Sequence, residues 1–118
     1  MVDNPTHRLR DELASVSFLP LRETDVTDDV DLSAVLLSNL NLQSASRSQV
    51  SLEQAIFRDV QAATSSWHDL RLEQVLFHRC LLNNVQFAAC RFDRVEFHGC
   101  QLTGVNFANA QLHDTLFR

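Results

Sequence analysis

An apolar residue recurs every five positions through most of this chain, and this period limits the possible folds more than any other feature. In the stretch CRFDRVEFHGCQLTGVNFANAQL, residues 90–112, the larger apolar residues are Phe92, Phe97, Leu102, Phe107 and Leu112. A second apolar series lies two positions before them: Cys90, Val95, Cys100, Val105 and Ala110. The phase holds back to Leu32 and Val30. Three positions break the apolar rule: Arg47, Ser65 and Thr115.

A period of five fits neither a regular helix nor a flat strand. Five steps of about 100° leave successive apolar residues about 140° apart around a helix. In an extended strand, residues two apart share a face, but an odd period sends the next pair to the opposite face. Both pairs point inward only if the chain turns between them in a constant direction. The period therefore predicts a β-solenoid with one apolar pair on each side of the coil.

The repeat resembles that of the pentapeptide-repeat family, in which a small residue, any residue, and Leu or Phe are followed by two more residues. The best copies are CRFDR, VEFHG, CQLTG, VNFAN and AQLHD, within a pattern that covers residues 30–118. The resemblance implies an all-β fold, a right-handed quadrilateral β-helix of about four coils, in which residues twenty apart stack. Departures at Arg47, Ala62 and Ser65 make the second and third coils less regular.

Residues 1–29 form an acidic leader or cap before the repeats. The leader holds most of the net negative charge, with seven acidic residues against three arginines. Asn4 before Pro5 is a favourable helix start, and Leu9, Leu13 and Val16 share one helical face. A short helix is therefore expected in the leader, followed by an acidic linker.

The composition excludes several classes of function. All ten basic residues are arginines and the formal net charge is −5, which argues against direct nonspecific binding to nucleic acid. The apolar run in SVSFLPL is too short for a membrane span and is a poor match to a signal peptide. Three cysteines are too few for a disulfide framework. We expect a cytoplasmic, single-domain bacterial protein with no membrane association.

Coils of twenty residues place the aromatic side chains in two inner columns. One column is Leu37, Phe57, Phe77, Phe97 and Phe117, and the opposite one is Arg47, Trp67, Phe87 and Phe107. Stacking of like on like lets a solenoid close-pack, so both columns are predicted to form the core. Arg47 is expected to extend its charged group to solvent over the Trp67 ring.

The cysteines and histidines do not form a recognisable metal or redox site. Cys80 and Cys100 stack in one inner column, while Cys90 lies across the core. Stacked side chains run parallel, which is poor geometry for a disulfide, and the thiols do not converge on a metal. His78 and His98 are predicted to be exposed in a basic column. We expect buried, reduced thiols and neither a metal nor a cofactor.

No catalytic motif is present. The sequence has no glycine-rich phosphate loop, nucleophile elbow or metal-binding helix pattern. Its two glycines, Gly99 and Gly104, suit corners of the coil. A solenoid with short turns also lacks the long loops that usually build a pocket. We therefore predict that the protein is not an enzyme.

One outward column is apolar although the repeat permits any residue there. It consists of Leu36, Ile56, Leu76 and Leu116, interrupted only by Glu96. An exposed apolar stripe usually marks a partner-binding site, so these four leucine and isoleucine side chains are candidate contacts. Three alternatives are open: the leader covers the stripe through SFLPL at residues 17–21, a second subunit or another protein covers it, or the stripe stays exposed.

A second outward column is acidic. It contains Glu53, Glu73 and Asp93, and we call it the acidic ladder. Arg71, Arg91 and Arg94 lie nearby, so a solvated face with salt bridges is the simpler interpretation. The family resemblance implies an alternative, because some members mimic duplex DNA, bind DNA gyrase and protect it from quinolones. Those relatives are longer and often carry a projecting loop.

The C-terminal coils are predicted to form a homodimer. Related rods often dimerise there, and coils 95–118 are expected to meet across a two-fold axis that buries Leu116 and Phe117. The alternative is that the chain is a fragment whose continuation covers this end. The predicted function is a non-enzymatic protein-binding scaffold of unknown partner, with the gyrase- or topoisomerase-binding DNA mimic as the alternative.

Overall fold

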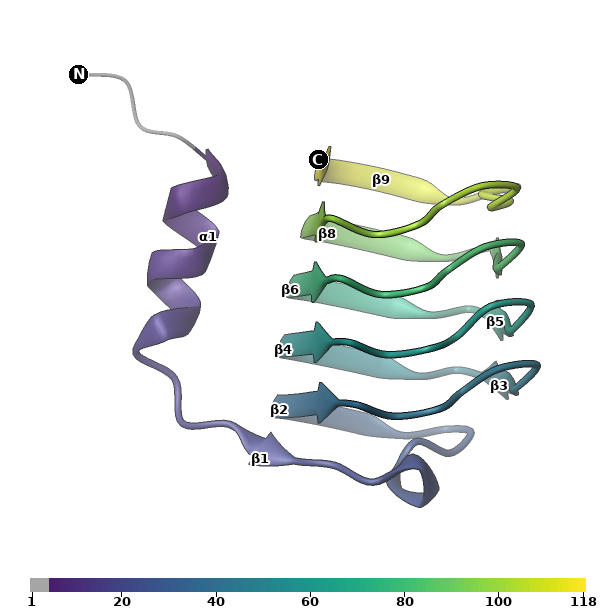
Figure 1. Ribbon diagram of the computed structural model, residues 1–118, viewed down its shortest axis with the longest axis horizontal. Coiled ribbons are helices and arrows are strands. Elements are labelled where there is room, and N and C mark those ends of the chain that lie inside the picture. The colour runs from purple at the N-terminus through teal and green to yellow at the C-terminus, as the bar shows by residue number, and fades with distance from the viewer. Residues whose placement is uncertain (1–4) are drawn as a thin grey trace.

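Parallel strands stack one above another, each twenty residues after the last (Figure 1). The computed structural model describes residues 5–118, with side chains from Leu9 onward. The stacked strands are β2 (Asp31–Ser38), β4 (Ser51–Arg58), β6 (Arg71–His78), β8 (Arg91–His98) and β9 (Gln111–Phe117). They form a sheet in the order β1-β2-β4-β6-β8-β9, so the long strand occurs on five successive levels. The predicted all-β helical fold is confirmed.

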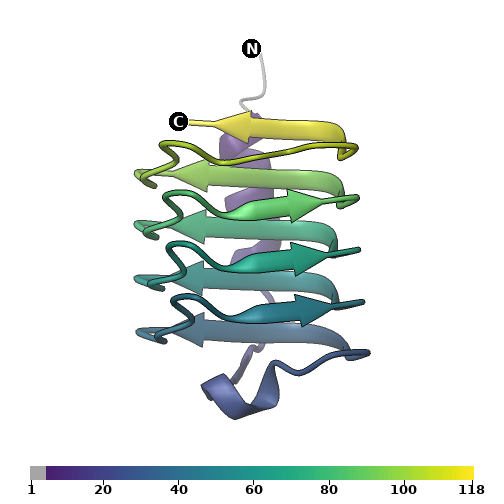
Figure 2. The ribbon, with the colours of Figure 1, turned by 90° about the vertical axis from the view of Figure 1, so that its right-hand side faces the viewer.

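A second parallel sheet forms another side of the coil (Figure 2). Its strands are β3 (Ser46–Ser48), β5 (Ser66–His68) and β7 (Gln86–Ala88). Isolated bridges on a further side join residues 41, 61, 81 and 101 in the same twenty-residue register. Every level therefore repeats the same path, and side chains twenty residues apart become neighbours.

A left-handed backbone conformation occurs at every fifth residue and turns the chain. The positions are Asp29, Ala34, Asn39, Ser44, Gln49, Gln54, Asp59, Thr64, Asp69, Gln74, Arg79, Asn84, Ala89, Arg94, Gly99, Gly104, Asn109 and Asp114. Their φ angles lie between 50° and 74°. This conformation costs a residue with a Cβ atom about 1 kcal/mol. Gly104 avoids that cost, and a Cβ atom there would also overlap the Asn84 side chain.

The predicted aromatic column fills one side of the core. The rings of Phe57 and Phe77 stack with centroids 4.4 Å apart, and those of Phe77 and Phe97 are 4.6 Å apart. Phe117 continues the stack at 4.9 Å from Phe97. Leu37 is fully buried below them. Because neighbouring strands are about 4.8 Å apart, rings in register can stack on every level.

The coil that contains β5 departs from the repeat at residues that compensate for one another. Trp67 is larger than the Phe or Leu found at equivalent positions, and Ala62 is smaller. The Trp67 indole Nε1 donates a hydrogen bond to Ser65 Oγ over 2.8 Å, and Ser65 Oγ in turn donates to the Ala62 carbonyl oxygen. All three residues are buried. The small Ala62 accommodates the indole, and the buried Ser65 satisfies its N–H group.

The leader runs along one side of the β-helix and then under its first coil (Figure 1). It comprises α1 (Pro5–Ala14), β1 (Leu19–Pro20) and the 3₁₀ turn Glu23–Asp25. The predicted helix is present but ends at Ala14, and the expected start at Asn4 lies outside the described residues. None of the described helices is long and apolar enough to span a membrane.

The second half of the leader closes the N-terminal end of the core. Leu21 and Val26 are buried and belong to the same apolar cluster as the repeats. Arg47 Nε donates to the Val26 carbonyl oxygen over 2.6 Å, and Arg47 Nη1 donates to the Ser46 carbonyl oxygen over 2.9 Å. The prediction that Arg47 extends to solvent over Trp67 is therefore wrong, because the leader offers it an acceptor.

Candidate functional site

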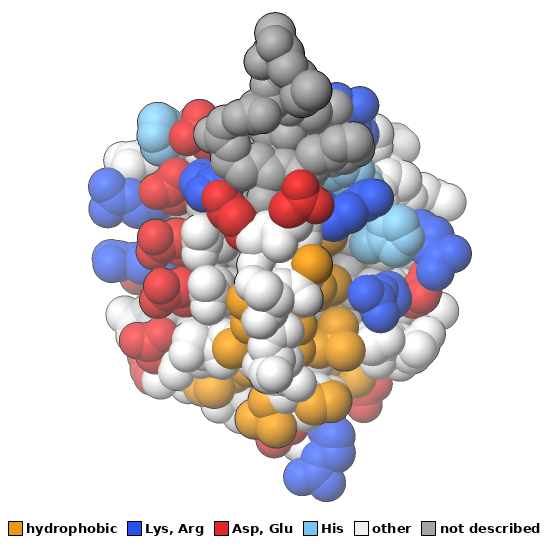
Figure 3. Space-filling view, turned by 90° about the vertical axis from the view of Figure 1, so that its left-hand side faces the viewer, with side chains coloured by type: hydrophobic (Ala, Val, Ile, Leu, Met, Phe, Trp, Pro, Cys, Tyr) orange, Lys and Arg blue, Asp and Glu red, His pale blue; other side chains and the backbone are white. Residues whose placement is uncertain are grey.

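The left-handed corner within each long strand divides it into two arms with different outer surfaces. In β6, Gln74 is the corner residue. The helix-covered arm follows it and carries the apolar stripe, whereas the ladder arm precedes it and carries the acidic ladder. Figure 3 looks onto α1 and shows hydrophobic side chains beside it, with charged side chains along both flanks.

The leader covers much of the apolar stripe. Leu9 and Leu13 of α1 form a buried cluster with Leu76, and Ile56 packs against this cluster. β1 lies beside β2, and the Leu21 N–H donates to the Leu36 carbonyl oxygen over 2.8 Å. Leu116 is half-buried on the last level. Of the possible covers for the stripe, the structure shows the leader packed against Ile56 and Leu76.

Polar contacts at the edge of the stripe also hold α1. Arg94 Nη2 lies 2.8 Å from Glu12 Oε2, and Gln74 Nε2 donates to the same oxygen over 3.4 Å. Sequence reasoning placed Arg94 beside the acidic ladder, but its ion pair instead joins the corner of β8 to α1. The leader has no repeat, so no periodic signal could align Glu12 with Arg94.

Glu96, which interrupts the apolar stripe, is shielded from water and pairs with His98. Glu96 is only 4% exposed, and its Oε1 lies 2.9 Å from His98 Nε2. The expectation that His98 is an exposed residue is therefore wrong. Outward residues two apart in a strand share a face, which is the signal that could have paired Glu96 with His98.

His78 lies in a groove between α1 and the helix-covered arm, about 360 Å³ in volume. Arg10 and Arg58 also line this groove. Burial lowers the pKa of His78, and the positive charges of Arg79, Arg10 and Arg58 lower it further. Both causes disfavour the charged imidazolium, so the folded protein favours the neutral form of His78.

The acidic ladder lines an open groove on the other arm. Glu53, Glu73 and Asp93 are in register on adjacent strands. The groove, about 360 Å³ in volume, is also lined by Arg71 and Arg91. We expected nearby arginines to pair with the ladder. Across residues 9–118, however, no ion pair joins the ladder to these arginines, and Arg71 instead lies 3.8 Å from Asp69.

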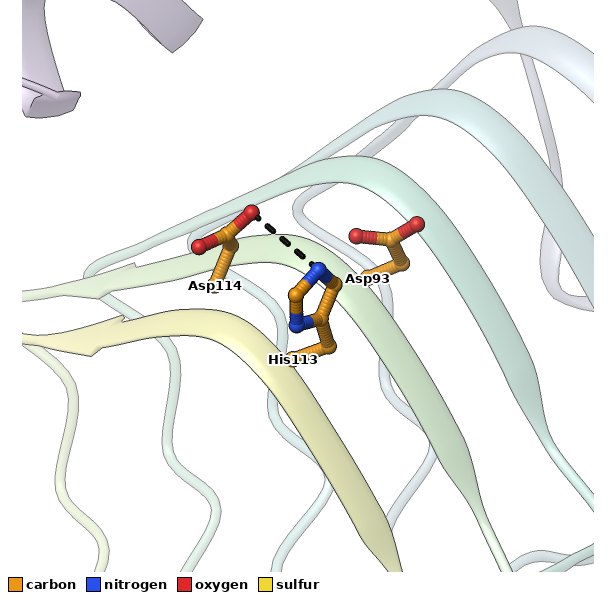
Figure 4. A group of neighbouring side chains, drawn as sticks. All are labelled: Asp93, His113 and Asp114. Atoms are coloured by element: carbon orange, nitrogen blue, oxygen red, sulfur yellow. Dashed lines mark ion pairs between the residues drawn. The ribbon is translucent and has the colours of Figure 1, made fainter.

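The upper end of the ladder forms a mixed cluster with the last strand (Figure 4). The possible ligand atoms of Asp93, His113 and Asp114 all lie within 4.8 Å of one another. His113 Nε2 is 3.5 Å from Asp114 Oδ2. Sequence reasoning treated His113 as isolated, although its twenty-residue spacing from Asp93 indicates the contact. The cluster is exposed to water, which competes for any cation, so it does not define a metal site by itself.

The cysteines differ in burial. Cys80 and Cys90 are buried, whereas Cys100 is only half-buried. All three are free thiols. The expected column of Cys80 and Cys100 is present, since the Cys80 N–H donates to Cys100 Sγ over 3.5 Å. The expectation of burial is wrong for Cys100.

Apolar side chains are exposed on the last level. Leu112 is 42% exposed and Phe117 is 43% exposed, although Phe117 stacks on Phe97. Leu116 is half-buried on the same strand. These side chains form the surface at which the C-terminal dimer was predicted.

A comparison with protein-family models agrees with the geometry of the later repeats. Residues 70–118 match the family model for a pentapeptide repeat region. No curated protein sequence matches the chain. A solved pentapeptide repeat protein, Rfr23 from the cyanobacterium Cyanothece 51142, matches at 20% identity with a TM-score of 0.27. That match covers 75% of this chain, which spans 65% of the length of Rfr23.

A second solved structure is a trypsin-treated variant of QnrB1, a plasmid-mediated fluoroquinolone resistance protein. It matches at 11% identity with a TM-score of 0.24, over 85% of this chain and 72% of that one. Both structural likenesses are distant.

Proposed function

Because its repeat region is a pentapeptide-repeat β-helix, we propose that this protein is a non-enzymatic scaffold that binds another protein. The support is structural. Each corner is made by a single left-handed residue, so the connections are short and the faces are rigid. Rigid faces with open grooves suit a protein surface better than a small substrate, which needs an enclosed site with converging polar groups. We place the scaffold in the bacterial cytoplasm, where free thiols persist.

The observation that carries this proposal is the open ladder arm. The leader occupies the helix-covered arm, whereas the ladder groove faces solvent. Carboxylates of the ladder repeat at about the strand spacing of 4.8 Å on a stiff backbone. A fixed row of charge favours association with a surface of complementary charge and rejects other partners. We infer a partner that presents basic side chains in a row.

Charge reversal tests the ladder arm directly. The Glu73→Lys variant places a positive charge in the middle of the ladder, and Asp11→Lys is the control because Asp11 is exposed on α1. Affinity capture from the native cytoplasm should recover a partner with wild type and Asp11→Lys but not with Glu73→Lys. Recovery of the same proteins with all three baits would exclude the ladder as the binding surface.

A second candidate function is binding to DNA gyrase or another topoisomerase by mimicry of duplex DNA. The regular column of Glu53, Glu73 and Asp93 favours it. Arg71 and Arg91 in the same groove weaken the resemblance to a continuous row of phosphates, so we prefer the general scaffold. A supercoiling assay with purified gyrase separates the two. Inhibition, or protection from quinolones, at low protein concentration would favour the mimic.

We also propose that the scaffold forms a homodimer through coils 95–118. The exposed Leu112 and Phe117, with the half-buried Leu116, supply an apolar surface for a two-fold contact. Sedimentation should show a dimer for wild type and a monomer for the Leu116→Asp, Phe117→Asp variant. A monomeric wild type at tens of micromolar, roughly the range of weak association, would exclude the dimer.

A further inference from the structure

The groove beside α1 has an apolar floor made by two adjacent levels of the coil. Ile56 of β4 and Leu76 of β6 lie in register there, and Leu13 and Ala14 line the groove from α1. Leu76 is buried, whereas Ile56 is only half-buried. The helix therefore covers the apolar stripe incompletely on these two levels, and a volume of about 360 Å³ stays open beside it.

The polar lining of this groove is entirely basic. It consists of Arg10 on α1, Arg58 at the end of β4 and His78 at the end of β6. No acidic residue among those that the structure describes lines the groove. Figure 3 shows arginine and histidine side chains next to one another along one flank of α1. Because the whole chain has a formal net charge of −5, the groove is a basic region on an otherwise acidic protein.

The arginines of the groove lack a counter-charge of their own. Asp59 follows Arg58 in the chain, but its Oδ2 lies 3.2 Å from Arg79 Nη2. The Glu12 carboxylate of α1 is held at the corner of β8. In the part of the chain that the structure describes, neither Arg10 nor Arg58 forms an ion pair, and both side chains are exposed. Two guanidinium groups therefore remain available to an anion from another molecule.

The positive charges act together at His78. Burial lowers the pKa of His78, and the charges of three nearby arginines lower it further. The same charges that disfavour a further cation at this place favour an anion there. The location of the excess positive charge thus coincides with the open volume beside α1.

We propose that this groove is a second protein-docking site, which binds a short extended peptide of a partner protein in which aliphatic side chains alternate with carboxylates. Side chains of an extended peptide point alternately to opposite sides. The aliphatic ones pack on Ile56 and Leu76. The carboxylates then face away from the floor, where the long side chains of Arg10 and Arg58 reach over the peptide and donate paired hydrogen bonds.

The chemistry of the groove favours such a peptide over other anionic partners. An apolar floor beside unpaired arginines is complementary to a ligand that has both aliphatic and acidic groups. An anionic lipid surface would meet the net charge of the whole molecule, −5, and would be repelled by it. A single segment of peptide meets only the local basic region. This site lies on the other arm from the acidic ladder, so loss of binding here would leave binding at the ladder unaffected.

Three matched peptides test the two halves of the proposal on the wild-type protein. The first is acetyl-Leu-Glu-Leu-Glu-Leu-amide, the second has Gln in place of Glu, and the third has Ser in place of Leu. Calorimetric titration should give a dissociation constant on the order of 100 μM for the first peptide. The second and third should each bind about tenfold more weakly, because one loses charge-assisted hydrogen bonds and the other loses apolar contact.

Two results with these peptides would overturn the proposal. Equal affinity for the Glu and Gln peptides would show that the arginines do not recognise the carboxylates. Absence of binding by all three peptides at about 1 mM would show that the groove does not take a peptide of this class.

A pair of substitutions assigns the binding to the groove. The Arg10→Gln, Arg58→Gln variant should bind the Glu peptide about tenfold more weakly and should bind the Gln peptide as wild type does. Both side chains are exposed, so their replacement leaves the core intact. Arg22→Gln is the control, because the Arg22 side chain is 85% exposed and does not line the groove. Equal weakening by this control would reduce the effect to net charge and contradict the site.

Nuclear magnetic resonance locates the peptide on the wild-type protein without any substitution. The ring resonances of His78 should shift during titration with the Glu peptide, and those of His68 should not, because His68 lies on β5 in the other sheet. Shifts at His68 alone would place the peptide elsewhere. Sedimentation with phosphatidylglycerol vesicles tests the lipid alternative. Binding to vesicles that the Arg10→Gln, Arg58→Gln variant loses would identify a lipid surface as the partner and overturn the peptide assignment.

Discussion

The two arms of each long strand share one interior but have different exteriors. In β6, Leu72 of the ladder arm and Phe77 of the helix-covered arm are both buried. Their outward neighbours differ, since Glu73 faces solvent and Leu76 packs under α1. The backbone repeats on both arms. The inward pair therefore specifies the coil, and the outward residue specifies what each face contacts.

The largest effect should follow truncation inside either arm. Phe77→Ala should cost about 3 to 5 kcal/mol and Leu72→Ala about 2 to 5 kcal/mol, because each leaves a cavity between stacked neighbours. Urea denaturation measures the free energy of unfolding. Substitutions at the surface change stability by under about 1 kcal/mol. If only one of the two variants showed so small a loss, the interiors of the two arms would not be equivalent.

Truncation of outward-facing side chains should affect the stability of the two arms differently. Leu76→Ala removes apolar contact with Leu9 and Leu13 and should cost about 2 kcal/mol. Glu73→Ala, three residues earlier on the ladder arm, should change stability by less than about 0.5 kcal/mol because its side chain is exposed. The same urea titrations measure both changes. Equal losses would mean that α1 adds nothing to the stability of the arm that it covers.

The corner between the arms offers a smaller, stabilising change. Ala34 has a φ angle of 54°, a conformation that Asn adopts more readily than Ala. Ala34→Asn should therefore stabilise the protein by about 0.5 kcal/mol. Ala63→Asn is the control, since Ala63 is not among the left-handed residues. If both variants gain equally, the effect does not come from the corner.

The smallest predicted effect is a pH dependence confined to the helix-covered arm. The pKa of His78 is below its ordinary value of 6.5, so the unfolded chain binds this proton more readily than the folded chain. Stability should fall as the pH drops through 6.5, with the full loss reached below the folded pKa. Urea titrations at about pH 7.5 and 5.5 should show less pH dependence for His78→Gln than for wild type. An unchanged dependence would exclude His78 as the source.

The interior could be predicted from the sequence because its inward-facing apolar residues recur with a fixed period. A five-residue period and a twenty-residue register place Phe57, Phe77 and Phe97 in one stack without knowledge of any other contact. The same register correctly aligns Glu53 with Glu73. Where two residues in contact lie twenty positions apart in the sequence, the period alone identifies the contact.

Contacts of the leader could not be predicted in this way. The acceptor for Arg47 is the Val26 carbonyl oxygen, and the partner of Arg94 is Glu12. Both partners lie before the repeats, where no period relates one residue to another. The cover over Leu76 depends likewise on how α1 docks. The contacts of the leader therefore required three-dimensional coordinates, whereas the contacts between coils did not.

Because a left-handed corner occurs at every fifth residue, the direction of each side chain depends on its position within the five-residue repeat. Loss of a single residue between Asp59 and Arg79 would move every later side chain one position out of phase, so polar residues would enter the core. Loss of the whole twenty-residue segment 59–78 would leave all later residues in phase and only shorten the rod. Duplication and deletion of whole coils are thus the changes in length that this architecture accepts most easily during evolution.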